Sequence, residues 1–445
     1  MKKLLLTGFA LVAIMAQAQN SWVAQATNFA ANGGVKEICI VDANTAWITS
    51  YDGSGGGAYP RVYGKTTNGS TWSTGPITGT AANALISDIH GVDANNAWVV
   101  TAPYTGSTTA NAIWKTSDGG ATWAKQTSGY GSNASSFANH IYFWDANNGW
   151  TSGDPVAGKF EMYKTSNGGT TWTAVAGALA PQNANEFTYV GLKEVLGDNI
   201  WVGSSIGRVL HSPDRGVTWT GNFSPVLDFG GVITAGSSGS FAFSSPTNGL
   251  LIAVDSGPVA ALYSTSDGGV TWDPVTPTGT WYFGDVAYVP GTANTYVTTG
   301  INFNDTSWLG SAYSTDGGQT WTSIDAGEQR GEVKFLNPTT GYAGQFSDGP
   351  AGTTGIMKFS GNLNLATSET GVKSNLKVYP NPASDIVNVS ADKKIDTVTI
   401  IDLSGKKVQS AKGNQVNVSN LAKGTYILQV NYGGGAVENT KLIKK

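Results

Sequence analysis

The chain has 445 residues, of which only 13% are charged, and it contains 59 glycines, 15 tryptophans and a formal net charge of −4. Low charge and many aromatics exclude an intrinsically disordered chain, while abundant glycine, threonine and aromatics favour short strands joined by tight turns. Residues 376–445 contain ten lysines and five acids, so residues 1–375 carry −9. Such an acidic body argues against a nucleic-acid partner, because phosphate backbones require basic clusters.

Residues 1–18 predict a secretory signal peptide. Lys2 and Lys3 precede an apolar run over residues 4–15, and Ala-Gln-Ala at 16–18 offers a cleavage site between small residues. The alternative is a membrane anchor, but the run is shorter than the roughly 20 residues that a span needs. We therefore expect no transmembrane segment in the mature chain. The single cysteine, Cys39, lies in an apolar run and is expected to be a buried structural thiol.

A motif ending in Thr-Trp recurs along residues 65–321, as in Lys-Thr-Ser-Asp-Gly-Gly-Ala-Thr-Trp at 115–123. The Asp or Asn accepts backbone N–H groups and glycine takes positive φ, so each copy predicts a tight turn before a strand. The turn residue is Asp118, Asn167, Asp214, Asp267 or Asp316. The closing residues are Trp72, Trp123, Trp172, Trp219, Trp272 and Trp321. Their steps of 51, 49, 47, 53 and 49 residues predict a propeller or a solenoid.

These copies resemble the Asp box of BNR-repeat β-propellers, a group that includes sialidases, sortilin-like receptors and photosystem assembly factors. The resemblance implies that each box forms a hairpin at the periphery of a blade. It therefore implies a structural role, and no catalytic one, for the acidic residues of the boxes.

A second recurring position counts the blades. Aromatic or apolar residues at equivalent points of a predicted second strand are Trp47, Trp98, Trp150, Trp201, Leu250, Tyr296 and Tyr342, which makes seven positions against six boxes. Residues 21–25 resemble residues 122–126, and Trp22 lies 50 residues before the first closing tryptophan. We therefore predict an all-β chain with a seven-bladed β-propeller over residues 19–364, in which the N-terminal strand completes the last blade.

The composition changes after residue 364. Residues 365–375 predict a polar linker, and alternating apolar strands at 397–400 and 426–430 predict a small, Ig-like β-sandwich over residues 376–445. Leu-Lys-Val-Tyr-Pro-Asn-Pro-Ala at 376–383 and Lys-Leu-Ile-Lys-Lys at 441–445 resemble the type A sorting domain of the type IX secretion system. The alternative is a carbohydrate-binding or adhesive sandwich domain.

The sorting-domain resemblance implies a route and a partner. The secretion machinery would bind the C-terminal domain and carry the chain through the periplasm and across the outer membrane of a Gram-negative cell. In that family the tail is usually cleaved, so the mature protein would be secreted or held at the outer-membrane surface.

Four acids are candidates for a site in the channel of the propeller. Counting ten residues back from the second-strand positions places Glu37, Asp88 and Glu332 near the mouth of the channel. The same count in the sixth blade reaches the residue next to Asp285. They could form a catalytic carboxylate pair or a site for a cation or a polar ligand. The interpretation that we favour is a set of solvated strand ends around a wet channel. The three histidines lack metal-ligand spacing, and no cofactor is expected.

A sialidase would need three arginines for the substrate carboxylate. The chain has Arg61, Arg208, Arg215 and Arg330, and it lacks the Arg-Ile-Pro motif of that family. Arg215 lies in an Asp box, and two others begin predicted third strands, away from the axis. This pattern disfavours a sialidase.

Aromatics embedded in Gly, Ser, Asn and Thr mark the predicted loops: Tyr51, Tyr59, Tyr104, Tyr130, Trp281, Tyr282 and Trp308. They suit stacking on sugars or contact with peptides, although the alternative is that they pack on their own blades. The sequence thus predicts a surface module that binds an extracellular glycan or protein ligand. A glycoside hydrolase or lyase, and a structural or assembly-factor propeller, are the alternatives.

Overall fold

The computed structural model describes residues 20–57, 59–104, 110–127, 130, 133, 135–255, 259–301, 308–364, 376–391, 394–402, 406–432 and 437–445. It divides into two compact units, Met1–Ala366 and Thr367–Lys445. The secondary-structure elements assigned in these ranges are all β-strands, which agrees with the predicted all-β class. In the described part of the chain no helix has the length and apolar character to cross a membrane.

The first unit is a seven-bladed β-propeller, as predicted, and each blade is one antiparallel meander. The innermost strands are β2 (Gly33–Ile40), β6 (Ala84–Gly91), β10 (Ala138–Phe143), β14 (Thr188–Leu196), β18 (Ser238–Phe243), β23 (Asp285–Tyr288) and β27 (Val333–Asn337). The second strands are β3 (Ala46–Asp52), β7 (Ala97–Pro103), β11 (Gly149–Val156), β15 (Asn199–Ser204), β19 (Gly249–Asp255), β24 (Tyr296–Gly300) and β28 (Thr340–Gly344).

The outer half of each blade consists of the third and fourth strands. The third strands are β4 (Val62–Thr66), β8 (Ala112–Thr116), β12 (Lys159–Thr165), β16 (Arg208–Ser212), β20 (Val259–Thr265), β25 (Gly310–Ser314) and β29 (Gly355–Ser360). The fourth strands are β5 (Trp72–Pro76), β9 (Ala124–Lys125), β13 (Thr173–Ala174), β17 (Thr220–Phe223), β21 (Asp273–Val275), β26 (Thr320–Ala326) and β1 (Ser21–Ala26). A short strand, β22 (Thr278–Gly279), pairs in parallel with β26.

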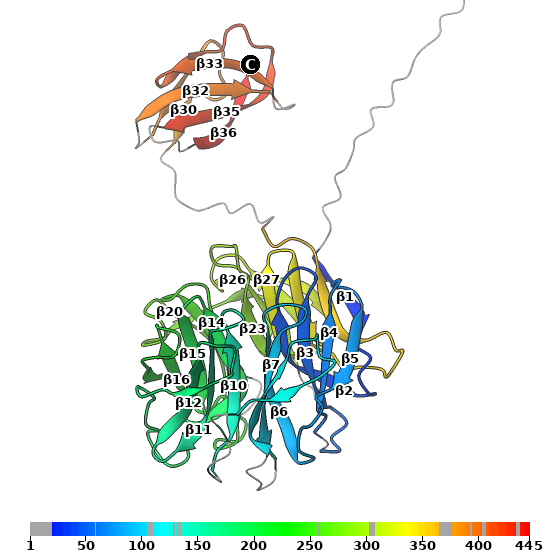
Figure 1. Ribbon diagram of the computed structural model, residues 1–445. Coiled ribbons are helices and arrows are strands. Elements are labelled where there is room, and N and C mark those ends of the chain that lie inside the picture. The colour runs from blue at the N-terminus through cyan, green and yellow to red at the C-terminus, as the bar shows by residue number, and fades with distance from the viewer. Residues whose placement is uncertain are drawn as a thin grey trace, which may run out of the picture. The chain divides into compact units, whose positions relative to one another are not determined.

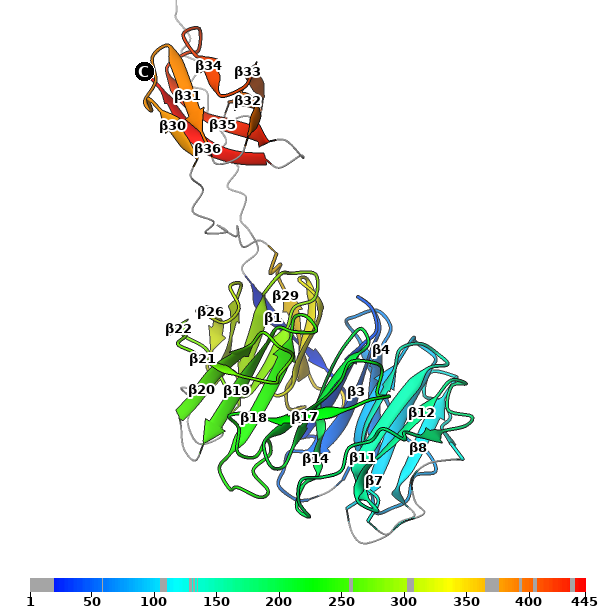
Figure 2. The same ribbon diagram turned by 90° about the vertical axis from the view of Figure 1, so that its left-hand side faces the viewer.

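The innermost strands contact one another in ring order, and β27 contacts β2, so the ring is closed around a central channel. The N-terminal strand β1 completes the last blade by pairing with β29, with Trp22 opposite Phe359. Figure 1 and Figure 2 show the dark-blue β1 in the same sheet as yellow strands from the other end of the propeller. The predicted closure is therefore confirmed, and it leaves no unpaired edge between the first and last blades.

The core lies between the blades, where the second-strand residues predicted from the repeat are buried. The rings of Trp47 and Trp98 are fully buried, and each indole Nε1 donates a hydrogen bond to a carbonyl outside its own blade, at Asp93 and Gly168. The apolar plate of one blade thus packs on its neighbour while its polar atom stays satisfied.

The Asp boxes lie in the turns between third and fourth strands. In one of them the Asp118 carboxylate accepts hydrogen bonds from the Thr116 hydroxyl and from both the backbone N–H and the hydroxyl of Thr122. Gly119 and Gly120 have φ of 74° and 94°, a region that favours glycine. The box side chains are therefore used in closing their own hairpins.

The second unit is a small β-sandwich. One sheet contains β30 (Lys377–Tyr379), β31 (Ile386–Ser390) and β34 (Gln415–Asn417), and the other contains β33 (Lys407–Lys412), β32 (Ile395–Ile401), β35 (Gly424–Tyr432) and β36 (Val437–Lys444). Val387 and Val389 of the first sheet pack with Val398, Ile400 and Leu428 of the second in one buried core. Alternation of apolar and polar residues along these strands directs one face of each sheet inward.

Candidate functional site

The two faces of the propeller differ in their connections. We call the face where the innermost strands begin the loop face, and the opposite one the turn face. Long segments such as 175–187, 224–237 and 345–354 lie on the loop face. The turn face carries short repeated turns such as 41–45 and 92–96, to which the Asp boxes are hydrogen bonded, as Gly69 N–H is to Asn44 O. Variable loops on a rigid scaffold commonly carry function, so the loop face is the candidate binding face.

Two cavities occupy the channel. One, of about 310 Å³, lies toward the loop face and is lined by Lys36, Ser240 and Asp285 among others. The other, of about 360 Å³, lies toward the turn face and includes His90, Tyr142 and Tyr288. Both are lined by Glu37, Gly191, Lys193, Glu332 and Lys334. The charged side chains therefore lie at the middle of the channel, where the two cavities meet.

Two of the four predicted acids bind the backbone of the next blade. Asp88 on β6 accepts a hydrogen bond from Ile141 N–H on β10 at 2.7 Å. Asp285 on β23 accepts one from Val333 N–H on β27 at 2.8 Å, and it also accepts the Ser240 hydroxyl. A buried carboxylate that joins neighbouring strands contributes to the ring itself, so these acids are positioned by structural contacts.

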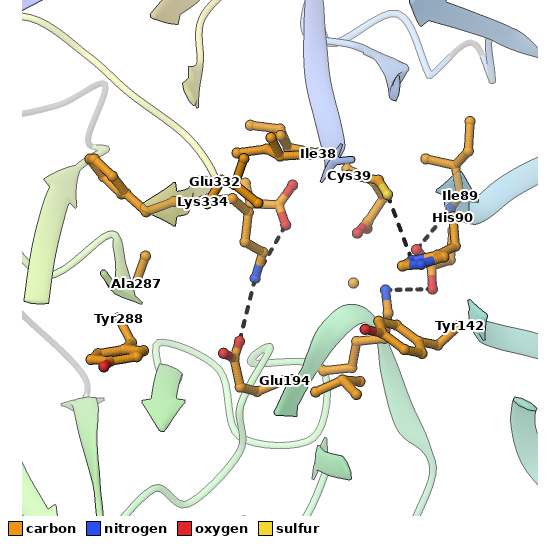
Figure 3. A pocket seen from close by; sticks show the side chains of 18 of the residues that line it. Ile38, Cys39, Ile89, His90, Tyr142, Glu194, Ala287, Tyr288, Glu332 and Lys334 are labelled. Carbon is orange, nitrogen blue, oxygen red and sulfur yellow. Dashed lines mark hydrogen bonds and ion pairs between the residues drawn. The ribbon is translucent and has the colours of Figure 1, made fainter. Parts of the chain in front are cut away.

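Two lysines neutralise part of the negative charge of the channel acids. Lys193 Nζ lies 2.6 Å from Asp88 Oδ2. Lys334 Nζ lies between Glu332 Oε1 at 3.6 Å and Glu194 Oε2 at 3.9 Å, as the dashed lines in Figure 3 show. Burial works against their charge, but the surrounding acids raise the pKa of both lysines above the usual value. Both ammonium groups are therefore charged and held by carboxylates.

Glu37 and Glu332 are the acids that this pairing leaves incompletely neutralised. Glu37 is 4% exposed, and among the described residues its carboxylate makes no hydrogen bond or ion pair. Burial, with repulsion by Glu332 and Asp88, raises its pKa well above the usual value. Burial also raises the pKa of Glu332 to about 7, because Lys334 offsets it only in part. Glu332 Oε2 is buried without a hydrogen-bond partner.

The His90 imidazole and the Cys39 thiol at this level are neutral. Burial, with the Lys193 charge, lowers the pKa of His90 to about 3, and burial raises the pKa of Cys39 to about 11. His140 lines neither cavity and bonds the Tyr189 carbonyl of the next blade. In the described residues no group of three or more His, Cys, Asp or Glu side chains could hold a metal ion. The acids are thus arranged for hydrogen bonding and ion pairing.

The four arginines do not converge. Arg208 is buried and pairs with Glu186 at 3.0 Å, and Arg330 is buried against Asp325. Arg215 pairs with Asp198, and Arg61 donates to the Ala82 carbonyl. Each guanidinium is occupied by its own local partner, so they form no three-arginine pocket for a substrate carboxylate.

Most of the predicted aromatics pack on their own blades. Tyr130 and Tyr282 are buried, with their hydroxyls bonded to Thr151 Oγ1 and the Asp325 carbonyl. Trp281 stacks on Trp321 and Trp308 packs at a tilt on Phe283, both within one blade. Tyr51 packs edge-to-face on Phe346 of the neighbouring last blade.

Tyr59 and Tyr104 are the exception. They are 41% and 42% exposed, and their rings stack at 4.2 Å with 18° between planes. Beside them lies a cavity of about 350 Å³ lined by Lys36, Ser50, Tyr51, Asp52, Gly57, Tyr59, Pro60, Leu85 and Ile86. Lys36 also lines the channel cavity on the loop face. The structure thus brings Tyr51 and Tyr59 to one pocket, beside the channel mouth.

Sequence reasoning missed the channel lysines and one loop. Lys193 and Lys334 lie two residues after Gly191 and Glu332, so the period of two along a strand would have placed them on the same side. The missed loop is 224–237, where buried Asp228 accepts N–H groups from Ile233 and Thr234 and leaves apolar side chains exposed. No local pattern marked this loop.

Comparison with known proteins supports both units. Residues 377–445 match the model of the family described as "Secretion system C-terminal sorting domain". This confirms the predicted resemblance of the C-terminal unit and identifies a tail that directs export by type IX secretion to the cell surface or outside. A search of curated proteins found no match.

Solved structures similar to the chain are β-propellers. A structure described as "YCF48 bound to D1 peptide" has a TM-score of 0.52 and 17% identity, over 78% of this chain and 98% of that one. YCF48 from Cyanidioschyzon merolae has a TM-score of 0.53 and 15% identity, over 76% of this chain and 99% of that one. A GH74 xyloglucanase from Xanthomonas campestris has a TM-score of 0.49 and 14% identity, over 93% of this chain and 59% of that one. At these identities the YCF48 likeness shows the fold alone.

Proposed function

We propose that this protein is an exported, non-catalytic binding module whose propeller holds an extracellular glycan on its loop face. Residues 1–18 would take the chain across the inner membrane, and the domain at 376–445 would take it from the periplasm across the outer membrane of a Gram-negative cell. The propeller over residues 19–364, joined by a linker at 365–375, would then act at the cell surface or in the medium.

The exposed Tyr59–Tyr104 pair carries the proposal. A stacked tyrosine pair offers a rigid apolar face with hydroxyls at its edge, which matches the apolar face and hydroxyl rim of a sugar ring. The adjoining pocket adds the Asp52 carboxylate and the Lys36 ammonium beside Tyr51. Its volume of about 350 Å³ lies within the range of small-ligand pockets, roughly 300–1,000 Å³. A protein ligand is the alternative occupant of the same surface.

The test is a glycan array probed with the full chain, followed by titration of the best glycan. The double substitution Tyr59→Ala and Tyr104→Ala should weaken binding at least tenfold, because each lost ring contact costs about 1 kcal/mol or more. Tyr59→Phe with Tyr104→Phe is the matched control, since it keeps the stacked rings and should retain most of the affinity. Phe223→Ala removes a more exposed ring, on β17, and should have no effect. The proposal would be refuted if the best glycan bound the alanine double variant with the same affinity as the parent chain.

One observation favours a second candidate, a glycoside hydrolase. Glu37 and Glu332 face the same cavities and both have raised pKa values, as an acid catalyst requires. A hydrolysis screen on the full chain would test it. Hydrolytic activity of the parent chain that disappears in both Glu37→Gln and Glu332→Gln would establish a glycoside hydrolase. If the parent chain hydrolyses none of the glycans that it binds, this second candidate is refuted.

A further inference from the structure

The middle of the channel has more carboxylate than cation. Five acids, Glu37, Asp88, Glu194, Asp285 and Glu332, line the two cavities together with three lysines, Lys36, Lys193 and Lys334. Lys193 and Lys334 are held by acids. Lys36 donates to the Ile86 carbonyl at 2.8 Å, and burial lowers its pKa. The cluster therefore carries an uncompensated negative charge whenever its acids are ionised.

That excess is concentrated on two side chains. Glu37 is more than nine-tenths buried and has no hydrogen-bond or ion-pair partner among the described residues. Glu332 Oε2 is buried and unpartnered as well. Both side chains line both cavities. A buried carboxylate oxygen without a donor costs free energy. Glu332 has Lys334 at one oxygen only, so each of the two side chains can still accept a proton or a further cation.

We propose that the channel binds a small organic ammonium ion, a primary alkylamine, with its charged group between the Glu37 and Glu332 carboxylates. An ammonium donates three hydrogen bonds, which suits acceptor atoms that lack donors. A metal ion fits poorly, because the described residues offer no group of three ligands of the usual kind.

The cavity on the turn-face side determines the kind of amine. It holds about 360 Å³ and is lined by Ile40, Leu196, Pro290, Phe335 and Leu336 beyond the charged level. The rings of Tyr142 and Tyr288 lie at its sides, as Figure 3 shows. An alkyl tail of a few carbons would remove this apolar surface and the tyrosine rings from water. A strongly polar polyamine would leave that lining unmatched.

Protons compete with the amine for this site. Burial raises the pKa of Glu332 to about 7 and raises the pKa of Glu37 well above its usual value, so protons occupy part of the empty site at neutral pH. The charged or titratable groups that line the two cavities around the pair are Lys36, Cys39, Asp88, His90, Tyr142, Lys193, Glu194, Asp285, Tyr288 and Lys334. Burial keeps His90, His140, Cys39 and Tyr142 neutral between pH 6 and 8. Amine affinity should therefore rise about tenfold from pH 6 to pH 8 as Glu332 loses its proton.

Calorimetric titration of the full chain with n-pentylammonium at pH 8 tests the inference, with 1-pentanol as the uncharged probe and Ca²⁺ as the metal alone. We expect the amine to bind, with proton release near pH 7, and neither of the other probes to compete with it. Glu37→Gln and Glu332→Gln keep the side-chain shape and should each weaken the amine at least tenfold. Glu328→Gln, at an exposed acid outside the channel, should bind as the parent does.

Three results would overturn the inference: no amine binding to the folded parent chain, equal binding of pentanol, or unchanged binding in both glutamine variants. If either variant fails to fold, the pH dependence and proton release of the parent chain decide the question alone. The Tyr59→Ala and Tyr104→Ala double variant should bind the amine normally. Failure of the glycan proposal and failure of this one are therefore separate outcomes.

Discussion

Removal of the Trp22 ring tests whether strand β1 closes the propeller energetically. The ring packs edge-to-face on Phe335 and Phe359, at centroid distances of 6.0 and 5.4 Å. Its Nε1 donates to Ser311 Oγ at 2.9 Å, and the Arg330 guanidinium lies over it at 5.5 Å. Tryptophan-to-alanine changes in cores cost about 3–5 kcal/mol. Because Trp22 is only half-buried, we expect Trp22→Ala to cost about 3 kcal/mol, at the lower end of that range.

Urea unfolding followed by tryptophan fluorescence measures this cost. All 15 tryptophans lie between residues 22 and 321, so the signal reports the propeller and not the C-terminal unit. With an m-value of about 3 kcal/mol/M, as suits a domain larger than the small-protein range, the midpoint should fall by about 1 M. Trp22→Phe keeps an aromatic ring but loses the hydrogen bond to Ser311. The lost hydrogen bond should lower the free energy of unfolding by about 1 kcal/mol, in addition to the cost of the smaller ring.

The reasoning would be refuted if Trp22→Ala unfolded at the same urea concentration as the parent chain. That result would mean that β1 pairs with β29 without contributing to the stability of the ring. A midpoint equal in the alanine and phenylalanine variants would show instead that the hydrogen bond, and not the ring packing, stabilises the closure.

Three further predictions use the same assay or its thermal counterpart. Asp267→Ala should cost about 1–2 kcal/mol through lost box hydrogen bonds, whereas Asp267→Asn should be milder, because Asn167 accepts the equivalent backbone N–H. Glu186→Gln should cost about 3–5 kcal/mol because it leaves Arg208 buried without a counter-charge; an unchanged midpoint would contradict this. The raised pKa of Glu332 favours its protonated form in the folded state, so this contribution is full at acidic pH and is lost as pH rises through about 7. Glu332→Gln should therefore flatten the fall in melting temperature from pH 5 to pH 8, and a parallel shift at both values would argue against it.

The positions of the repeat were readable because they are dictated by local chemistry and by one strand period. Trp98 and its equivalents recur at a fixed step, since every blade must bury one large side chain against the next. The blade that the strand of Trp22 joins was also predictable, because a strand in step with the repeat can occupy only the missing outer position of the last blade. These features need no knowledge of distant contacts.

The channel acids show where that reasoning stops. Counting along the strands put Glu37, Asp88, Asp285 and Glu332 around one channel, and the structure places all four there. It could not separate Asp88 and Asp285, which bind the N–H groups of neighbouring blades, from Glu37 and Glu332, which do not. A partner more than forty residues away decides that difference.

By itself the sequence determined that the chain forms a seven-bladed propeller closed by its N-terminal strand, followed by a sandwich that resembles a sorting domain. Turn chemistry, strand alternation and a fixed period are local properties, and each repeat of the sequence shows them again. Only the tertiary structure decided which aromatics are exposed, as Tyr59 and Tyr104 are while Tyr130 and Tyr282 are buried. It also decided which carboxylate oxygens lack a hydrogen-bond partner, as Glu332 Oε2 does. Burial, and pairs such as Asp88 with Lys193, depend on side chains that different blades bring together.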